Sequence, residues 1–408
     1  MDSVLLVTDS YRPNYDGMAT SIKGIATALR DLGKPVTVVW ISPGPTDDRT
    51  DYDDEGIKVI RCSFTRPSFR LPMHGINESR RILHAVLAEG KPTHVWVRWP
   101  IYAVALARYF KNTPFVYVVG NSHPVSILGA ITGLAASDTP RRAKLAYLYL
   151  VSGKWEKEIL EACSRTVVFS RDGLAQFQER HGGLSSKVAV VYPGITKKQI
   201  AAPAFPVAQT WLKREWGIPD HRKLIMYVGH MGGAKVASLW EAIALLRRRD
   251  ESISEKQWHV MFVGPGADPP SFRKRASKLG VADSVTYCGV QKELLGAYYS
   301  GAWAHVLPSH VESFGYVLVE AAVCSAPSIA FSADGKRTRV AADDIIVDNQ
   351  TGLLAKPATA EGLANAIEKA LSWSEEERER IGMNAREHVL GKFSWDRFVK
   401  EVLAFSEE

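Results

Sequence analysis

The stretch Leu307-Pro-Ser-His-Val-Glu-Ser-Phe-Gly-Tyr-Val-Leu-Val-Glu-Ala-Ala322 decides how the rest of the sequence is interpreted. It begins at the end of the short apolar run 304–307, which is typical of a buried parallel strand, and passes through a polar loop into a helix that opens at Gly315. In an open parallel sheet, the loop between a strand and the next helix lies at the ligand-binding edge. The stretch therefore predicts an α/β fold with binding groups in this loop.

The same alternation of short apolar runs and longer amphipathic segments extends in both directions. In the first half, strands are expected at residues 4–8, 36–41, 57–61, 94–98, 115–119, 166–170 and 188–192. In the second half, they are expected at residues 224–229, 259–264, 285–289, 304–308, 328–331 and 345–347. This pattern predicts two doubly wound parallel sheets, each covered by helices on both faces.

The two series of strands are separated where the pattern breaks, at Tyr192-Pro193-Gly194. We expect an N-terminal Rossmann-like domain, a linker, a C-terminal Rossmann-like domain and a final helix that packs back on the first domain; their ranges are 1–195, 196–222, 223–385 and 386–408. The carboxyl ends of the two sheets are expected to face each other across a cleft. That cleft is the expected binding site, because doubly wound sheets bind ligands at this edge.

Composition narrows the class of protein. Hydrophobic residues make up 46% of the chain and charged residues 23%, an ordinary globular balance. The four cysteines, at positions 62, 163, 288 and 324, form no C-x-x-C pair, so we expect buried thiols in a reducing compartment. The first strand begins at Val4 without a basic leader, and no apolar run approaches the roughly 20 residues that cross a bilayer. A cytoplasmic protein is expected.

The charge is unevenly distributed. Residues 1–200 carry 26 Lys and Arg against 18 Asp and Glu, whereas the remaining residues carry 25 against 26. A basic half favours an anionic acceptor or peripheral contact with an anionic membrane face, and a solvated surface explains it equally well, so both interpretations stay open. Nucleic acid is not expected as a partner, since no zinc-finger pattern, ribonucleoprotein pattern or dense basic helix is present.

Three parts of the opening stretch carry chemistry. At the expected helix start, the amides of Phe314, Gly315 and Tyr316 have no intrahelical acceptor, so they can hold an anion or a sugar hydroxyl. Glu320 lies among apolar neighbours, where a carboxylate needs hydrogen-bond donors such as the two hydroxyls of a vicinal diol. Glu312 precedes the helix on the loop and can accept a hydrogen bond from a hexose.

A glycine-rich loop follows the strand at 224–229. The sequence Tyr227-Val-Gly-His-Met-Gly-Gly-Ala-Lys235 lets the backbone approach a diphosphate, and Lys235 can reach its charge. Near the N-terminus, Gly17 lies in a loop between the first strand and a helix, as a phosphate-facing residue does. The segment Gly120-Asn-Ser-His123 follows another expected strand.

Together these motifs resemble retaining glycosyltransferase family four, which has the two-Rossmann GT-B fold. The resemblance rests on Pro-Ser-x-x-Glu-Ser-Phe-Gly-x-x-x-x-Glu-Ala, with two glutamates separated by seven residues, and spans nearly the whole chain. It implies that Glu320 binds the ribose of the donor and that Glu312 and the amides of residues 314–317, including Val317, hold the sugar and its phosphates. It identifies His123 with the family's histidine that contacts the transferred sugar, and it places the acceptor on the first domain and the donor on the second.

The sequence departs from the family pattern at two positions. His230 stands where the family usually has Arg, which suggests weaker or pH-dependent phosphate binding. Met18 follows Gly17 where a second glycine or a valine is common.

Two further sets of residues have side chains that suit a ligand, one an acceptor and the other a metal. Arg66, Arg70 and Arg98 are candidates for contact with the acceptor. Asp51-Tyr-Asp53-Asp54 has a D-x-D spacing that suits a divalent metal, but it lies in a charged stretch before a strand, so we expect a solvated loop. Neither a metal nor a resident cofactor is expected.

The resemblance implies transfer of a hexosyl unit, with retention of configuration, from a UDP- or GDP-sugar to a hydroxyl of an acceptor sugar, glycoside or lipid. Catalytic roles are implied for His123, Glu312 and Lys235, and the departing phosphate is implied to receive the acceptor's proton. Two alternatives remain open: an enzyme like the nucleotide-sugar epimerases of the same fold, and a relative that binds sugar nucleotides without turnover.

Overall fold

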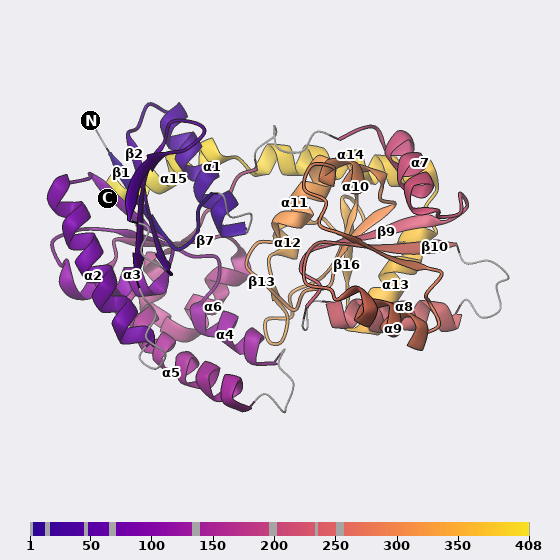
Figure 1. Cartoon of the computed structure of the whole chain (residues 1–408), viewed down its shortest axis with the longest axis horizontal. Helices are drawn as coiled ribbons and strands as arrows, with labels where there is room; N and C mark the ends of the chain where they lie inside the picture. The colour runs from indigo at the N-terminus through magenta and orange to yellow at the C-terminus, as the bar shows by residue number, and fades with distance from the viewer. Residues whose placement is uncertain are drawn as a thin grey trace. The chain divides into compact units, whose positions relative to one another are not determined.

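The computed structural model describes residues 3–12, 17–44, 48–64, 71–132, 139–195, 202–232, 236–249 and 257–407. The chain divides into two compact units (Figure 1). The first unit takes in Met1–Leu128, Thr139–Ile195 and Phe393–Glu408, and the second takes in the rest.

Among the described residues, the first unit holds an eight-stranded sheet in the order β3-β4-β2-β1-β5-β6-β7-β8. Its strands are β1 (Val4–Thr8), β2 (Val36–Pro43), β3 (Arg49–Tyr52), β4 (Lys58–Phe64), β5 (His94–Val97), β6 (Val116–Val118), β7 (Arg165–Val168) and β8 (Val188–Val190). The strands pair in parallel apart from β3, which runs antiparallel to β4 at the edge. The strand order reverses between β1 and β5, so the loops that follow these two strands diverge to opposite sides of the sheet.

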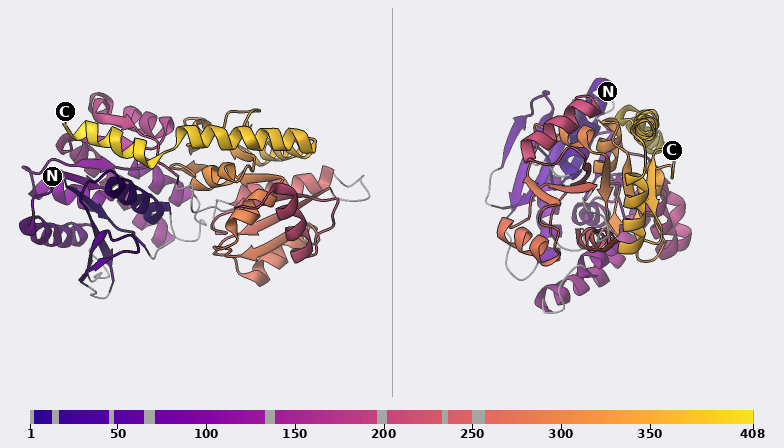
Figure 2. Two further views of the ribbon diagram at one scale, coloured as in Figure 1. Left: turned by 90° about the horizontal axis from the view of Figure 1, so that it is seen from above. Right: turned by 90° about the vertical axis from the view of Figure 1, so that its right-hand side faces the viewer.

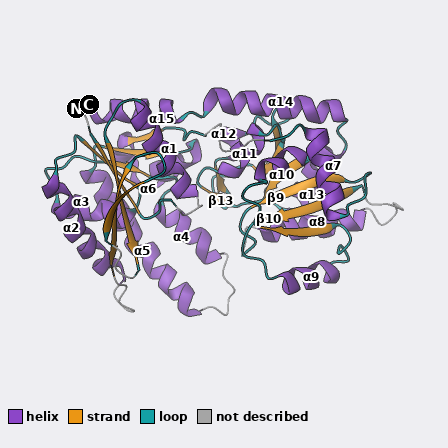
Figure 3. Cartoon of the chain, turned by 45° about the horizontal axis from the view of Figure 1, so that its top comes forward, coloured by secondary structure: helices purple, strands orange, loops and turns teal. Residues whose placement is uncertain are grey.

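Helices cover both faces of this sheet, as Figure 3 shows. They are α1 (Gly17–Asp31), α2 (Leu71–Glu89), α3 (Pro100–Tyr109), α4 (His123–Thr132), α5 (Thr139–Ala162), α6 (Arg171–His181) and α15 (Trp395–Glu407), with a 3-10 helix η1 (Gly182–Lys187). Alternate strand residues such as Leu5 and Val7 pack with α2, α3 and α5, whereas their neighbours Val4 and Leu6 point to the opposite face. Burial on both faces explains why a central strand such as β1 is apolar along nearly its whole length.

Within the described ranges, the second unit holds a six-stranded parallel sheet in the order β11-β10-β9-β12-β14-β16. The strands are β9 (Lys223–Val228), β10 (Trp258–Val263), β11 (Val285–Gly289), β12 (Ala304–Leu307), β14 (Ser328–Phe331) and β16 (Gly352–Ala355). A small separate ribbon joins β13 (Val311–Glu312) in parallel to β15 (Arg339–Val340). Here the strand order reverses between β9 and β12.

Two apolar clusters form the core of the second unit, one on each face of its sheet. Ile225 and Tyr227 pack with one set of helices, and Leu224 and Met226, which alternate with them, pack with the other. The helices are α7 (Phe205–Trp216), α8 (Ala237–Arg249), α9 (Pro269–Lys278), α10 (Leu295–Gly301), α11 (Tyr316–Val323), α12 (Ala342–Ile345), α13 (Ala360–Leu371) and α14 (Glu375–Lys392). Helices α8, α9 and α13 contribute to the first cluster and α7, α10 and α11 to the second.

The predicted fold class of two doubly wound parallel sheets is confirmed. One expected strand is wrong: Ile345 ends helix α12, and the last strand of the sheet is β16. Asp343 and Asp344 lie in the first turn of α12, where carboxylates are favourable.

The last two helices belong to different units; both are yellow in Figure 2. Helix α14 packs on α11 in the second unit and runs through Gly391 to Lys392. Helix α15 packs on α1 in the first unit, where Trp395 lies so close to Gly24 and Gly194 that neither position has room for a Cβ atom. The range expected to be a linker, 196–222, contains α7, which packs on α10.

The structure bears on two features expected from composition, the state of the cysteines and the lack of a membrane-spanning helix. Cys163, Cys288 and Cys324 are buried, Cys62 is partly buried, and all four thiols are unpaired. In the part of the chain that the structure describes, no helix is long and apolar enough to span a membrane.

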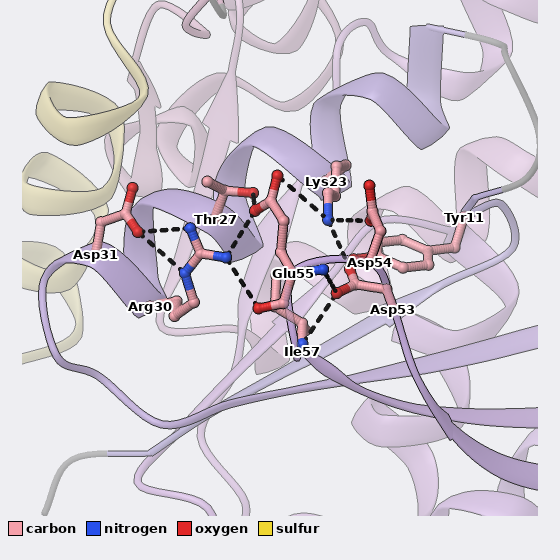
Figure 4. Close-up of polar contacts among 9 residues, drawn as sticks. All are labelled: Tyr11, Lys23, Thr27, Arg30, Asp31, Asp53, Asp54, Glu55 and Ile57. Atoms are coloured by element: carbon pink, nitrogen blue, oxygen red, sulfur yellow. Dashed lines mark hydrogen bonds and ion pairs between the residues drawn. The ribbon is translucent and has the colours of Figure 1, made fainter.

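The expectation of a solvated loop at 51–54 is wrong for Asp53, which lies at the centre of a buried polar cluster (Figure 4). The Asp53 carboxylate accepts hydrogen bonds from Lys23 Nζ at 2.8 Å and from the Tyr11 hydroxyl at 2.6 Å, and both charged side chains are only 7% exposed. Its other oxygen accepts the amides of Glu55 and Ile57. Asp53 thus forms an ion pair between α1 and the turn before β4, whereas Asp51 lies on β3 and pairs with Arg49 and Arg61.

We expect Asp53→Ala to destabilise the protein by about 2–3 kcal/mol, because it leaves the buried Lys23 ammonium short of its main partner. The neighbouring Asp54 side chain is 80% exposed, so Asp54→Ala serves as the matched control and should cost less than about 1 kcal/mol. Urea unfolding at pH 7 measures both. Equal midpoints for the two variants would contradict the assignment.

The same pair predicts a pH dependence. Burial raises the pKa of Asp53, but the hydrogen bonds from Lys23, Tyr11 and the amides of Ile57 and Glu55 together outweigh it and hold that pKa below its ordinary value of 3.8. The stabilisation is therefore present above that value and is lost as the pH falls through the folded-state pKa. The difference in the free energy of unfolding between wild type and Asp53→Ala, measured by urea titration, should become smaller below about pH 4.

Candidate functional site

The candidate site of the second unit lies where the strand order of its sheet reverses. Strands β9 and β12 are parallel neighbours at this point, and the chain leaves them toward opposite sides. The loops that follow their carboxyl ends therefore diverge and leave room for a ligand between them. One is the glycine-rich loop that begins at Gly229, and the other is the stretch from Pro308 to Gly315.

Backbone contacts fix the start of the glycine-rich loop. The Gly229 amide donates to Val263 O, the Met231 amide donates to Pro265 O, and the Tyr227 hydroxyl donates to His230 O at 3.0 Å. Gly264 adopts φ 135°, and a Cβ atom there would collide with the carbonyl oxygen of Gly229. Two glycines are thus required for the close approach of the loops after β9 and β10.

His230 is exposed, and its ring orientation is fixed from one side. Nδ1 of His230 accepts the amide of Gly232 at 2.9 Å, which in the neutral ring leaves the proton on Nε2. A Cβ atom at Gly266 would overlap the His230 ring, so the imidazole packs directly against that glycine. The loop therefore presents a hydrogen-bond donor where a ligand would lie. Lys235 lies outside the described residues.

Glu312 is held on the ribbon between β13 and β15. The Arg339 amide donates to His310 O at 2.8 Å, and Glu312 pairs in register with Val340. Burial and, next in size, the charge of Glu312 raise the pKa of Tyr227. Because β9 and β12 are paired neighbours, the glycine-rich loop and the ribbon that carries Glu312 follow the same edge of the sheet.

His310 received no role from the sequence, yet it links the two loops. Its Nδ1 lies 3.1 Å from Thr338 Oγ1, its Nε2 lies 3.3 Å from Ser238 Oγ near the start of α8, and its ring stacks on Phe331. Burial lowers its pKa. A histidine two residues after the expected strand 304–308 and two before a candidate glutamate was the only available signal.

The start of α11 has the backbone that the sequence predicts. Gly315 is the N-cap, with φ 84° and ψ 60°, a left-handed conformation that favours glycine. Phe314 is buried with its ring edge-on to Tyr316, and Val317 packs on the core. The first amides of this helix lack intrahelical acceptors and therefore suit an anionic or hydroxylated ligand.

Glu320 extends from α11 and is largely buried. Its Oε2 accepts a hydrogen bond from the Tyr299 hydroxyl at 2.8 Å. Burial raises the pKa of Glu320, while the Tyr299 hydroxyl opposes that change. A carboxylate in this setting gains most from further hydrogen-bond donors, such as ligand hydroxyls.

The candidate residues of the first unit also follow strand ends. The strand order of the first sheet reverses between β1 and β5. Gly17 is the first residue of α1, the helix after β1, and Arg98 directly follows β5. Arg98 is buried, with its guanidinium 4.8 Å above the Phe169 ring. Arg66 and Arg70 lie outside the described residues.

His123 is the first residue of α4, after the turn that follows β6. Its ring packs edge-on against Trp99, with centroids 5.7 Å apart. Burial lowers the pKa of His123, whereas the charge of Glu156 raises it. The imidazole is therefore mostly neutral at physiological pH, as a hydrogen-bonding group for a sugar would be.

No group of three or more His, Cys, Asp or Glu side chains among the described residues is arranged to hold a metal ion. The acidic cluster around Asp53 is occupied by the Lys23 ammonium.

Two family models match this chain. "Glycosyltransferase Family 4" matches residues 15–199, and "Glycosyl transferases group 1" matches residues 209–388. Together they take in nearly all of both units.

Named sequence relatives agree with these models. A D-inositol 3-phosphate glycosyltransferase of Geodermatophilus obscurus is 26% identical over 381 residues, covering 92% of this chain and 76% of the relative. A protein of the same name from Gordonia bronchialis is 28% identical over 378 residues, covering 90% of this chain and 74% of the relative.

Solved structures share the fold. Sucrose-phosphate synthase from Thermosynechococcus elongatus has a TM-score of 0.77 at 20% identity, covering 100% of this chain and 98% of that one. Anabaena HepE in complex with UDP and glucose has a TM-score of 0.71 at 15% identity, covering 99% of both chains. With two parallel-sheet α/β units and a family match across each, the chain belongs to the family 4-type glycosyltransferases of the GT-B fold.

Proposed function

We propose that this glycosyltransferase moves a hexosyl unit from a nucleotide diphosphate sugar to an acceptor hydroxyl, with retention of anomeric configuration. The observation that supports the proposal is that the loop with Gly229 and His230 and the loop that leads to Glu312 follow neighbouring strands at the switch point of the second sheet, with Glu320 on the helix that follows. Doubly wound sheets bind nucleotides at this position.

Glu320 is proposed to bind the ribose. Its carboxylate already accepts one hydrogen bond, from Tyr299, and retains acceptor capacity for the two hydroxyls of a vicinal diol. Burial raises the pKa of Glu320 because it leaves the ionised carboxylate poorly solvated. The ionised form therefore gains more from those hydroxyls than an exposed carboxylate would. Glu312 is proposed to accept hydrogen bonds from the transferred sugar.

The diphosphate is proposed to lie on the glycine-rich loop. Nε2 of His230, the ammonium of Lys235 and the first amides of α11 at Phe314–Val317 would stabilise the charge that grows on the departing phosphate. The bond from the sugar to the phosphate breaks as the bond to the acceptor oxygen forms, and no separate general base is needed in this scheme, because the departing phosphate receives the acceptor's proton. Neither a metal nor a cofactor is part of the proposal.

The first unit is proposed to contact the sugar and the acceptor. His123 would bind the transferred sugar, Gly17 would allow close approach of the backbone, and Arg98, Arg66 and Arg70 would attract the acceptor. The net positive charge of residues 1–200 and the names of the inositol phosphate-specific relatives favour an acceptor that carries phosphate.

A panel of UDP-, GDP- and dTDP-sugars tests the donor. We expect one nucleotide class to raise the melting temperature and to be hydrolysed slowly, because a ligand at 100 times its Kd stabilises a protein by about 2.7 kcal/mol. Glu320→Ala should remove this thermal shift, and Asp53→Ala should keep it relative to its own baseline. Binding without any consumption of donor, with or without inositol phosphate as acceptor, would refute the enzyme; NMR of the product gives the anomeric configuration.

Metal independence has a separate test. Treatment with EDTA followed by gel filtration should leave the rate of donor hydrolysis unchanged, because cationic side chains and amides supply the positive charge at the leaving group. A loss of rate that Mg²⁺ or Mn²⁺ restores would contradict this part of the proposal.

Glu320→Gln separates binding from stability. At pH 7.5 the variant without donor should be at least as stable as wild type, because it removes a poorly solvated charge, while its donor affinity falls about tenfold or more. The folded-state pKa of Glu320 is raised from 4.5, so wild-type stability should fall relative to the variant as the pH rises through the interval above 4.5.

Glu293→Gln, at an exposed position, is the control for both readouts, which are urea unfolding and calorimetric titration. A large loss of stability in Glu320→Gln would mean that the carboxylate has a structural role.

A further inference from the structure

A buried carboxylate holds the turn that precedes His123. Glu156, on α5, is only 3% exposed. Its Oε1 accepts the backbone amide of His123 at 2.9 Å, and its Oε2 accepts the hydroxyl of Ser122 at 2.9 Å. One side chain from a helix 33 residues away thus fixes both the last residue of the turn and the first residue of α4.

The carboxylate is itself fixed by α6. Nε2 of His181 donates to Glu156 Oε2 at 2.8 Å, and the Arg180 guanidinium lies 3.5 Å from the same oxygen. The Ser122 amide donates to Gln176 Oε1 at 3.0 Å, so a second side chain of α6 secures the turn. Because the contacts with Ser122, His123 and His181 are 2.8–2.9 Å long and the carboxylate is buried, the turn has little freedom to relax.

The turn also contains a polar group without a protein partner. Asn121 is 3% exposed, and neither its amide nitrogen nor its amide oxygen finds a hydrogen-bonding partner in the described part of the chain. A buried amide that stays unsatisfied is costly, and such groups in native proteins call for an explanation. The turn is held by hydrogen bonds from α5 and α6, while the Asn121 amide lacks a partner among the described residues. This combination fits a ligand site better than a purely structural turn.

We propose that Glu156 is a positioning residue for sugar transfer: it holds the Gly120–His123 turn in place and keeps a negative charge behind the imidazole of His123. This inference rests on the proposed function. Glu156 does not touch the sugar in this scheme; it fixes the backbone from which His123 extends, so that the imidazole need not reorganise when the sugar binds.

The charged and titratable groups around this site come from four elements. They are Glu156 on α5, Arg180 and His181 on α6, Tyr117 on β6 and Arg98 after β5. The charge of Glu156 raises the pKa of His123 against the larger lowering effect of burial. Loss of that charge should therefore lower the pKa of His123 further and move protonation of the imidazole to lower pH.

Glu156→Gln tests the proposal, because it keeps the size of the side chain and removes the charge. With the nucleotide sugar that the panel selects, we expect kcat to fall about 10- to 100-fold with less than a threefold change in KM for the donor. The acid limb of the pH profile should move to lower pH. Glu158→Gln is the matched control: it lies on the same helix but pairs with Arg108 at 2.7 Å, and it should leave kcat, KM and the pH profile unchanged.

Two further measurements separate positioning from stability. Ser122→Ala breaks one contact with the carboxylate but keeps its charge, so kcat should fall only a few-fold while the acid limb stays in place. NMR titration of histidine ring carbons measures the pKa of His123 directly and needs no turnover. If Glu156→Gln folds but leaves both kcat and the His123 pKa unchanged, Glu156 is only a cap for α4 and the inference is overturned.

The outcomes also distinguish this inference from the proposed function. If wild type consumes no nucleotide sugar, the proposed function fails, and a lowered His123 pKa in Glu156→Gln would still support the electrostatic link. If wild type is active and Glu156→Gln behaves like Glu158→Gln in rate, pH profile and titration, the inference fails while the function stands.

Discussion

Parallel strands deliver all of their following loops to one edge of a sheet, and this constraint organises both units. In the second unit, the reversal between β9 and β12 brings the glycine-rich loop beside the ribbon that carries Glu312. In the first unit, the reversal between β1 and β5 places Gly17 and Arg98 after neighbouring strands, with His123 after the next strand along. The helices and cores hold these edges rigid, and the chemistry lies in short loops.

Buried or partly buried carboxylates recur in the structure, and each is stabilised differently. Asp53 is paired with Lys23, Glu156 is surrounded by donors from α4 and α6, and Glu320 has one donor, the Tyr299 hydroxyl. A fully paired carboxylate stabilises the fold around it, whereas a carboxylate with spare acceptor capacity is suited to a ligand. This contrast is the physical reason to assign structural, positioning and binding roles to these three groups.

The sequence predicted the parts of the structure that depend on local pattern. Apolar runs located most strands within a few residues, and the glycine at 315 marked the start of α11. Contacts between distant segments could not be predicted: neither the Asp53–Lys23 pair nor the Glu156–His123 link has a periodicity or a motif. His310 was missed for the same reason, since its partners Ser238 and Thr338 are far from it in sequence. Retention, donor identity and the roles of Lys235, Arg66 and Arg70 stay predictions.

The return of the chain to its first unit has a practical consequence for dissecting this protein. A fragment that stops near residue 195 would lack α15, and with it the Trp395 ring that covers Gly24 and Gly194. The surface left exposed would include the Phe169 ring, which packs edge-on against Phe398 with the ring centroids 6.1 Å apart. Such a fragment would be prone to aggregate. Expressing the first unit by itself therefore calls for a fusion that supplies residues 393–407 through a short linker, and premature stop codons very late in the gene should damage the amino-terminal half of the molecule.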